Sequence, residues 1–198
     1  WVKDFSYFRF FRHYLEPERH ITGPFPQTLE RWDQLCQTDR VVGIGGVDAH
    51  ARQYPVLPFT VFPYEMLFKT VRTHVLVKES FSGESSQDIS RLLDSVREGH
   101  CFLAYDLLAN AKGTYFGSQD GSVLMGDESA FDKPIDLEIQ LPHKAEITVI
   151  KNGQPYSQAS TAKHSFCAES EGVYRIEARL EGKPWIYTNP IYLRPEVK

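Results

Sequence analysis

Several features that would place the chain in a specialised class of protein are scarce or absent. Its 198 residues include only three cysteines, Cys36, Cys101 and Cys167. They are too widely spaced for a C-x-x-C zinc cluster and too few for a disulfide framework. Their apolar neighbours favour buried thiols in a reducing compartment, with one disulfide plus a free thiol as the open alternative. No apolar run reaches the roughly 18 residues of a membrane span, and the longest, at 41–47, is interrupted by glycine.

Neither sign of charge dominates, because 22 basic and 26 acidic residues are interspersed and the formal net charge is −4. No cationic face is visible for nucleic acid or an anionic membrane surface, so we expect neither as a direct partner. No basic segment followed by an apolar core opens the chain, so we expect a cytoplasmic protein. Since Trp1 rather than methionine comes first, we also expect the natural N-terminus to lie upstream.

The first part of the chain alternates between helical and strand patterns. Apolar residues at helical spacing predict helices from Asp4 to about Leu15 and from Thr28 to about Gln37. The continuous apolar run at 41–47 predicts a strand buried on both faces. Further strands are predicted at 73–77 and 101–105. This order is typical of α/β structure.

Two details of this first part predict local structure. Ser86 is expected to cap a helix with one apolar face, and Gly99 to supply the positive φ at its end. The residues of that face are Ile89, Leu92, Leu93 and Val96. Three prolines between 52 and 64 predict a long ordered loop there.

The pattern changes after Gly113, where short strands alternate with turn signals such as Asn152-Gly153. Strands are predicted at 135–141, 146–150, 165–168, 173–180 and 185–193. Such spacing without a helical period indicates an antiparallel sandwich of immunoglobulin-like type. We therefore divide the chain into an α/β part at 1–114 and an all-β part at 115–198.

The apolar run at 41–47 ends at the sequence D-A-H, which places Asp48 two residues before His50. On an extended backbone these side chains project to the same side and can offer an oxygen and a nitrogen to a metal. The donor types suit Zn, Mn or Fe. Arg52 follows closely and could contact an anionic substrate. The alternative is that Asp48 caps a turn, His50 is an ordinary surface imidazole and Arg52 is simply solvated.

The glycines at 43, 45 and 46 do not form a nucleotide-binding loop. Asp48 stands where a third glycine of G-x-G-x-x-G belongs, no clear helix opens after it, and no G-K-[ST] occurs. The chain also lacks a G-x-S-x-G setting for a nucleophilic serine.

The stretch G-I-G-G-V-D-A-H-A at 43–51 resembles the last metal-binding motif of the PHP (polymerase and histidinol phosphatase) superfamily of metal-dependent hydrolases. Similar segments of one branch are F-P-Y-E-M-L-F-K-T-V-R-T-H-V-L-V (62–77), I-S-R-L-L-D-S-V-R-E-G-H-C-F-L-A-Y-D (89–106) and W-I-Y-T-N-P-I-Y-L (185–193). That branch carries a β-sandwich after the catalytic barrel. The resemblance spans about residues 28–193 and is strongest at 41–51.

The resemblance implies a distorted β/α barrel with two or three divalent metals at its mouth. Metal-activated hydroxide would attack a small phosphoester, or a related ester, with the metals stabilising the developing oxyanion. Asp48 and His50 would be metal ligands and catalytic residues, and Arg52 would bind substrate.

The chain departs from the family pattern in one important respect. PHP sites also need an early H-x-H, a further acid and more histidines, whereas the seven histidines here form no H-x-H pair. We therefore expect the C-terminal portion of a PHP-type phosphoesterase, completed by a missing N-terminal part of the same protein and inactive alone.

Other candidates are weaker on sequence grounds. His20 is expected in an exposed loop, His74 hydrogen-bonded within a strand, and His100 at a helix C-terminus. Asp106 follows a strand but has no histidine beside it in the sequence. A different class of function is a carbohydrate- or protein-binding sandwich on a structural barrel remnant. Tyr156, Tyr174 and Trp185 could serve such a module, although alternating sandwich aromatics more often belong to the core.

Overall fold

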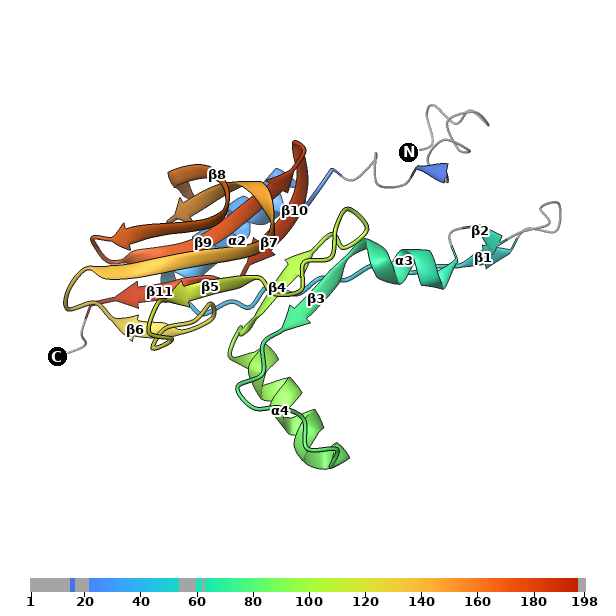
Figure 1. The fold of residues 1–198 in the computed structure, drawn as a ribbon, viewed down its shortest axis with the longest axis horizontal. Helices are drawn as coiled ribbons and strands as arrows, with labels where there is room; N and C mark the ends of the chain where they lie inside the picture. Colours follow the sequence, from blue (N-terminus) through green and yellow to red (C-terminus); the bar gives the residue numbers. More distant parts are fainter. Residues whose placement is uncertain (1–14, 17–21, 54–59, 62, 196–198) are drawn as a thin grey trace.

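The computed structural model describes residues 15–16, 22–53, 60–61 and 63–195 of the chain (Figure 1). The fold is β-rich. Its helices and strands are α2 (Pro26–Thr38), β1 (Arg52–Gln53), β2 (Thr60–Val61), α3 (Tyr64–Thr70), β3 (Arg72–Val75), α4 (Ser85–Arg97), β4 (Cys101–Ala104), β5 (Tyr115–Ser118), β6 (Glu128–Ala130), β7 (Ile135–Lys151), β8 (Gln154–Ala168), β9 (Gly172–Leu180), β10 (Lys183–Thr188) and β11 (Ile191–Arg194). Among the described helices, none has the length and apolar character needed to span a membrane.

Strand β9 organises a mixed sheet that does not close into a barrel. One edge of β9 pairs with the second half of β7, and the other edge pairs with β10 and then β11. Beyond β10 the order continues to β4 and β3, all antiparallel, whereas β11 pairs with β6 in parallel. Hydrogen bonding thus crosses the predicted boundary near residue 115, since β4 lies before it and β10 after it.

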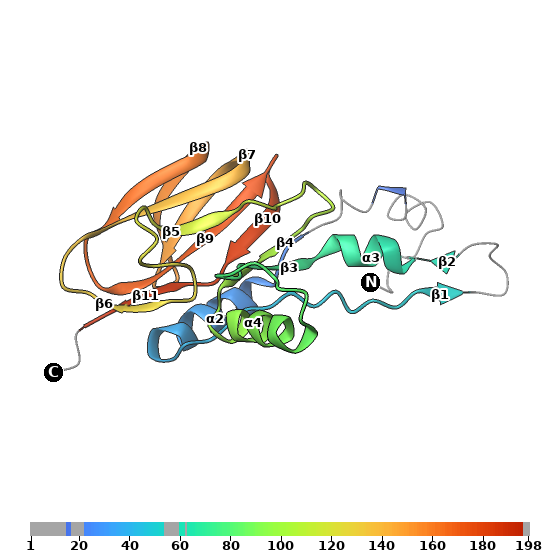
Figure 2. The same ribbon diagram turned by 60° about the horizontal axis from the view of Figure 1, so that its bottom comes forward.

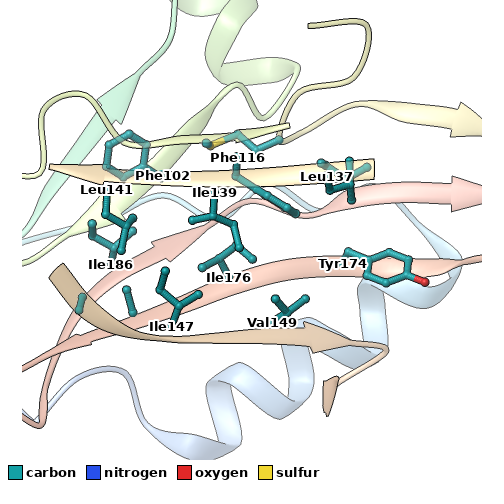
Figure 3. Close-up of a cluster of buried hydrophobic side chains, with 14 of the residues drawn as sticks. Phe102, Phe116, Leu137, Ile139, Leu141, Ile147, Val149, Tyr174, Ile176 and Ile186 are labelled. Atoms are coloured by element: carbon teal, nitrogen blue, oxygen red, sulfur yellow. The ribbon is translucent and has the colours of Figure 1, made fainter. Parts of the chain in front are cut away.

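The long strand β7 takes part in both layers of the β-rich core. Its first half pairs with β5 and its second half with β9, and a register shift separates Gln140 from Ala145. Figure 3 shows Leu137 and Ile139 pointing toward Ile147 and Ile176 across the interior, and all four side chains are buried. Burial of such large aliphatic side chains contributes about 1.5–3 kcal/mol each, which makes this core the main stabilising element.

Helix α2 confirms the prediction for 28–37, beginning at Pro26, where a missing N–H costs nothing at the first helical turn. Its inward side carries a charge that the sequence pattern did not reveal. The Asp33 carboxylate accepts two hydrogen bonds from Arg175 of β9, at 2.6 and 2.7 Å, and the guanidinium lies 5.3 Å from the Trp32 ring centroid. A buried bidentate ion pair therefore fixes α2 on the sheet.

Helix α4 also confirms its prediction, and Gly99 after it has φ +73°. Its start differs, because Ser86 does not cap it and the N-cap residue is Glu84. The apolar stripe is not covered: Ile89 is 57% exposed and Leu93 46%. In a compact domain such a stripe faces the core, so this exposed face is an anomaly of the fold.

The predicted strand at 41–47 is wrong, because the segment has no regular strand pairing. Its backbone is bonded to side chains instead: Gly43 to Asn189, and Gly45 N–H to Thr73 Oγ1 at 2.9 Å. Close approach explains two of the three glycines, since a Cβ on Gly43 would lie 2.8 Å from the Trp32 ring and a Cβ on Gly45 would lie 2.7 Å from Val71. Ile44 is 63% exposed, so the run is not buried on both faces.

Other local predictions have mixed outcomes. The predicted helix from Asp4 falls outside the described residues except at its end, and so does much of the loop at 52–64, where β1 and β2 form a short antiparallel pair. Residues 152–153 form the predicted turn with φ +51° and +79°. The predicted strands at 135–141 and 146–150 are parts of one strand, β7, and β8 is longer than the predicted 165–168, because the β7–β8 hairpin pairs over nearly its whole length. The predicted strand at 185–193 is divided into β10 and β11.

Buried Tyr187 of β10 makes stability sensitive to alkaline pH. Burial, reinforced by Glu177, raises the pKa of Tyr187 from 10 to about 12. Between pH 10 and 12 the unfolded chain ionises this phenol while the folded chain does not, so we expect its contribution to lower the free energy of unfolding by about 2–3 kcal/mol. Urea denaturation from pH 8 to 11.5 should show a steeper decline in the parent than in Y187F. Equal slopes would contradict this assignment.

Candidate functional site

Asp48 and His50 lie at the end of the unpaired segment 41–51, just before β1, and Figures 1 and 2 show this segment running beside β3 and α3. The His50 Nδ1 atom is 3.4 Å from an Asp48 carboxylate oxygen, and the side chains are 63% and 94% exposed, respectively. The two side chains do not come together through an extended backbone, as the sequence predicts, because Asp48 has φ +46°. A left-handed turn at Asp48, which aspartate tolerates better than most residues, brings the two groups together.

The hydrogen bonding of His50 determines which ring nitrogen can bind a cation. Nδ1 lies 2.8 Å from the Asp48 carbonyl oxygen, which can only accept, so Nδ1 carries the proton. In a neutral imidazole Nε2 then keeps its lone pair. Metal-binding histidines commonly use this arrangement, with one nitrogen donating to a carbonyl and the other facing the ion. The exposed Asp48 carboxylate is a second donor, but it lies beside Nδ1 rather than Nε2, so the Asp48 side chain must rotate to reach an ion held by Nε2.

A buried asparagine makes three of the hydrogen bonds that anchor the segment carrying this pair. Asn189, in the T-N-P-I-Y sequence, is 1% exposed. Its amide oxygen accepts from Gly43 N–H at 2.7 Å, and its amide nitrogen donates to the carbonyls of Gly43 at 3.1 Å and Cys101 at 2.8 Å. Asn189 thus substitutes for a neighbouring strand. Sequence reasoning missed this role, although the G-I-G-G and N-P-I-Y stretches were both conspicuous.

The remaining predicted site residue, Arg52, lies in β1 opposite Val61, and its side chain is outside the part of the chain that the structure describes. Across the described ranges, no three His, Cys, Asp or Glu side chains are grouped so as to hold a metal ion. The donor types of Asp48 and His50 therefore fit a divalent metal, but the number of donors does not complete a catalytic site.

A second polar cluster surrounds Asp106, whose side chain is only 3% exposed. His74 Nε2 lies 2.9 Å from its carboxylate, Arg72 Nη1 lies 3.2 Å away, and Ala111 N–H donates to it. The His74 ring stacks on Phe102. The histidine lacking beside Asp106 in sequence is supplied across the β3–β4 pairing. These contacts join β3 and the loop at Ala111 to the turn that follows β4, so the cluster is structural.

The third cluster centres on His100, which is 1% exposed. Nε2 lies 2.7 Å from Asp127. Nδ1 lies 3.1 Å from Glu98 but off the hydrogen-bond direction. Burial raises the pKa of Asp127, but hydrogen bonds from His100 and the Leu124 N–H outweigh it and leave that pKa lowered. His100 does follow the end of α4 as expected, where it joins that helix to the loop before β6.

The aromatic residues considered for a binding module are mostly core. Tyr174 and Trp185 are fully buried, and Trp185 donates its indole N–H to the Ala109 carbonyl. Tyr156 is 39% exposed and makes an edge contact with Tyr174. A single half-exposed ring is a small platform for a carbohydrate, so these aromatics favour the core interpretation.

Comparison of the chain with models of known protein families, with curated proteins and with solved structures found no match.

Proposed function

We propose that this chain is the C-terminal portion of a PHP-type metal-dependent hydrolase, a phosphoesterase, with an appended immunoglobulin-like sandwich. The observation that carries the proposal is the Asp48–His50 pair. The two side chains lie 3.4 Å apart and largely exposed, and Nδ1 of His50 is occupied by a carbonyl, so that Nε2 presents a lone pair. Asp48 and His50 would each supply a ligand to a divalent ion such as Zn, Mn or Fe.

Exposed apolar side chains on α3 and α4 support completion by further protein. Tyr64 and Phe68 stack on the outside of α3 and are 53% and 54% exposed, and the apolar stripe of α4 is open as well. These faces belong to the segments that resemble the PHP barrel. An upstream part of the same protein that covered them would bury apolar area and bring the missing metal ligands to the same region.

Two donors do not create the chemistry of a complete site. A bound metal would supply an activated hydroxide and stabilise negative charge on the phosphoester oxygens. The chain itself would position that ion through Asp48 and His50, and Arg52 would contact the anionic substrate. Without the further ligands we expect no hydrolysis of a phosphomonoester such as p-nitrophenyl phosphate by residues 1–198.

Zinc titration tests the pair directly. We expect the chain to bind Zn²⁺ weakly in isothermal titration calorimetry, and H50A or D48N to lower the affinity by at least about tenfold, because loss of a ligand should cost no less than loss of an outer-shell partner. H143A is the matched control, since His143 is exposed but lies next to no carboxylate donor in the described contacts.

Unchanged zinc affinity in H50A and D48N would remove the observation on which the function rests. Hydrolysis of p-nitrophenyl phosphate by the parent, carried out on the same preparations with Zn²⁺ or Mn²⁺, would contradict the incomplete-site interpretation.

A further inference from the structure

Strand β8 has a long free edge. Its 15 residues pair with β7 and with no other described strand. Both ribbon views place β8 at the rim of the sandwich (Figures 1 and 2). Such an edge presents a row of unpaired N–H and C=O groups, which is a template for another strand.

One stretch of this edge lacks the usual protection against pairing. Residues 157–161 pair in unbroken register with 149–145 of β7, between two irregularities. The surrounding sequence Y-S-Q-A-S-T-A at 156–162 contains neither charge nor proline, whereas Pro155 and Lys163 stand just outside it. Natural edges are commonly blocked by short length, charge, proline or a bulge, and none of these interrupts residues 157–161, which a bulge at Tyr156 precedes.

The other strand edges in the described sheet are protected. β3 has four residues and carries Arg72 and His74. β6 has three residues, and its Glu128 pairs with Arg194. β5 is also short, and an isolated bridge joins its Gly117 to Leu124 on the side away from β7. The 156–162 stretch is thus distinct in both length and neutrality.

The side chains facing the core beneath this edge are incompletely covered. Ala145, Ile147 and Val149 of β7 are buried, whereas their partners on β8 are only half-buried. Those partners are Ser157, Ala159 and Thr161. A strand added beside β8 would cover this remaining surface and pair the outward backbone groups at the same time.

We propose that residues 156–162 form a homodimer interface, in which the edge of one chain pairs antiparallel with the same edge of a second copy. Centred on Ala159, this register is self-complementary. It places Ser157 opposite Thr161 and Gln158 opposite Ser160, while the Tyr156 ring at the bulge packs against Phe166 and Tyr174. Lys163 faces Pro155, so no like charges meet. The same segment in both partners makes the interface isologous and closed. This homodimer interface does not depend on the proposed metal site.

The test uses charge on the exposed face, where Gln158 and Ser160 lie outside the core. In Q158K/S160K the register sets lysine opposite lysine twice, and we expect the dissociation constant to rise by at least about tenfold. In Q158K/S160E lysine meets glutamate at both places, so dimerisation should be restored. Sedimentation velocity over increasing concentration reads out assembly, and circular dichroism confirms that both variants fold.

The expected result is a concentration-dependent dimer for the parent and for Q158K/S160E, and a monomer for Q158K/S160K. A parent chain that stays monomeric up to about 1 mM, where even a complex of about −4 kcal/mol is half formed, would overturn the proposal. It would also be overturned if Q158K/S160K dimerised like the parent, or if Q158K/S160E failed to dimerise although folded. A monomeric parent would indicate instead that this edge pairs with an extended peptide of another protein.

Discussion

Replacing Asp33 by alanine is expected to lower the free energy of unfolding by about 3–5 kcal/mol, the largest effect that we predict. The Arg175 side chain is 3% exposed, and Asp33 accepts both of its bidentate hydrogen bonds. Removing the carboxylate leaves a buried guanidinium with Glu177 as its remaining ion-pair partner. Breaking one side of a buried pair typically costs this much. Urea denaturation followed by tryptophan fluorescence measures the change.

The control for this prediction is D94A, which breaks an ion pair of similar length, 2.7 Å, on the surface of α4. Both partners there are more than half exposed, so we expect a loss below about 1 kcal/mol. A double variant, D33L/R175M, removes both buried charges and should recover much of the stability lost in D33A. If D33A and D94A were equally stable, the ion pair would not be what holds α2 to the sheet.

Replacing Asn189 by alanine is expected to cost about 2–4 kcal/mol. The substitution leaves the Gly43 N–H and the buried carbonyl of Cys101 without the amide that they share. Each buried polar group left unsatisfied costs about 1–3 kcal/mol. The same change should release the segment that carries Asp48 and His50, so amide hydrogen exchange across 41–50 should become faster.

N110A is the matched control, because Asn110 bonds one backbone N–H in an exposed turn. We expect it to change neither global stability by more than about 0.5 kcal/mol nor exchange across 41–50. If exchange across 41–50 were the same in N189A as in the parent, the segment would not depend on Asn189 for its position.

Local patterns predicted α2 and α4 but not α3, and the reason for the two successes is physical. In α2 and α4 the apolar spacing, Pro26 at the start of one and Gly99 after the other act over a few residues, so they need no knowledge of distant partners. The turn at Asn152-Gly153 is equally local, since its positive φ values suit these two residue types.

The prediction for residues 41–47 failed because composition does not specify a hydrogen-bonding partner. An apolar run with glycines fits a buried strand, yet the backbone of Gly43 is satisfied by the side chain of Asn189, 146 residues later. The exposed stripe of α4 fails for a related reason. Helical spacing states which residues share a face, but not whether anything covers that face.

The candidate site shows the same division. That Asp48 and His50 belong together followed from their separation of two residues, whereas the turn that joins them and the proton on Nδ1 required the structure. The His74–Asp106 pair was invisible because it depends on how β3 and β4 align, which no local signal records.

The sequence by itself determined α2 and α4, the turn at Asn152-Gly153, the β-rich character of the second part and the proximity of one carboxylate to one imidazole, because each follows from interactions within a few residues. Only the tertiary structure decided that α2 is held by a buried ion pair, that an asparagine anchors the segment bearing Asp48 and His50, and that β8 keeps an open edge. Those features depend on which distant segments meet, and they arise from long-range packing and hydrogen bonding between groups far apart in the chain.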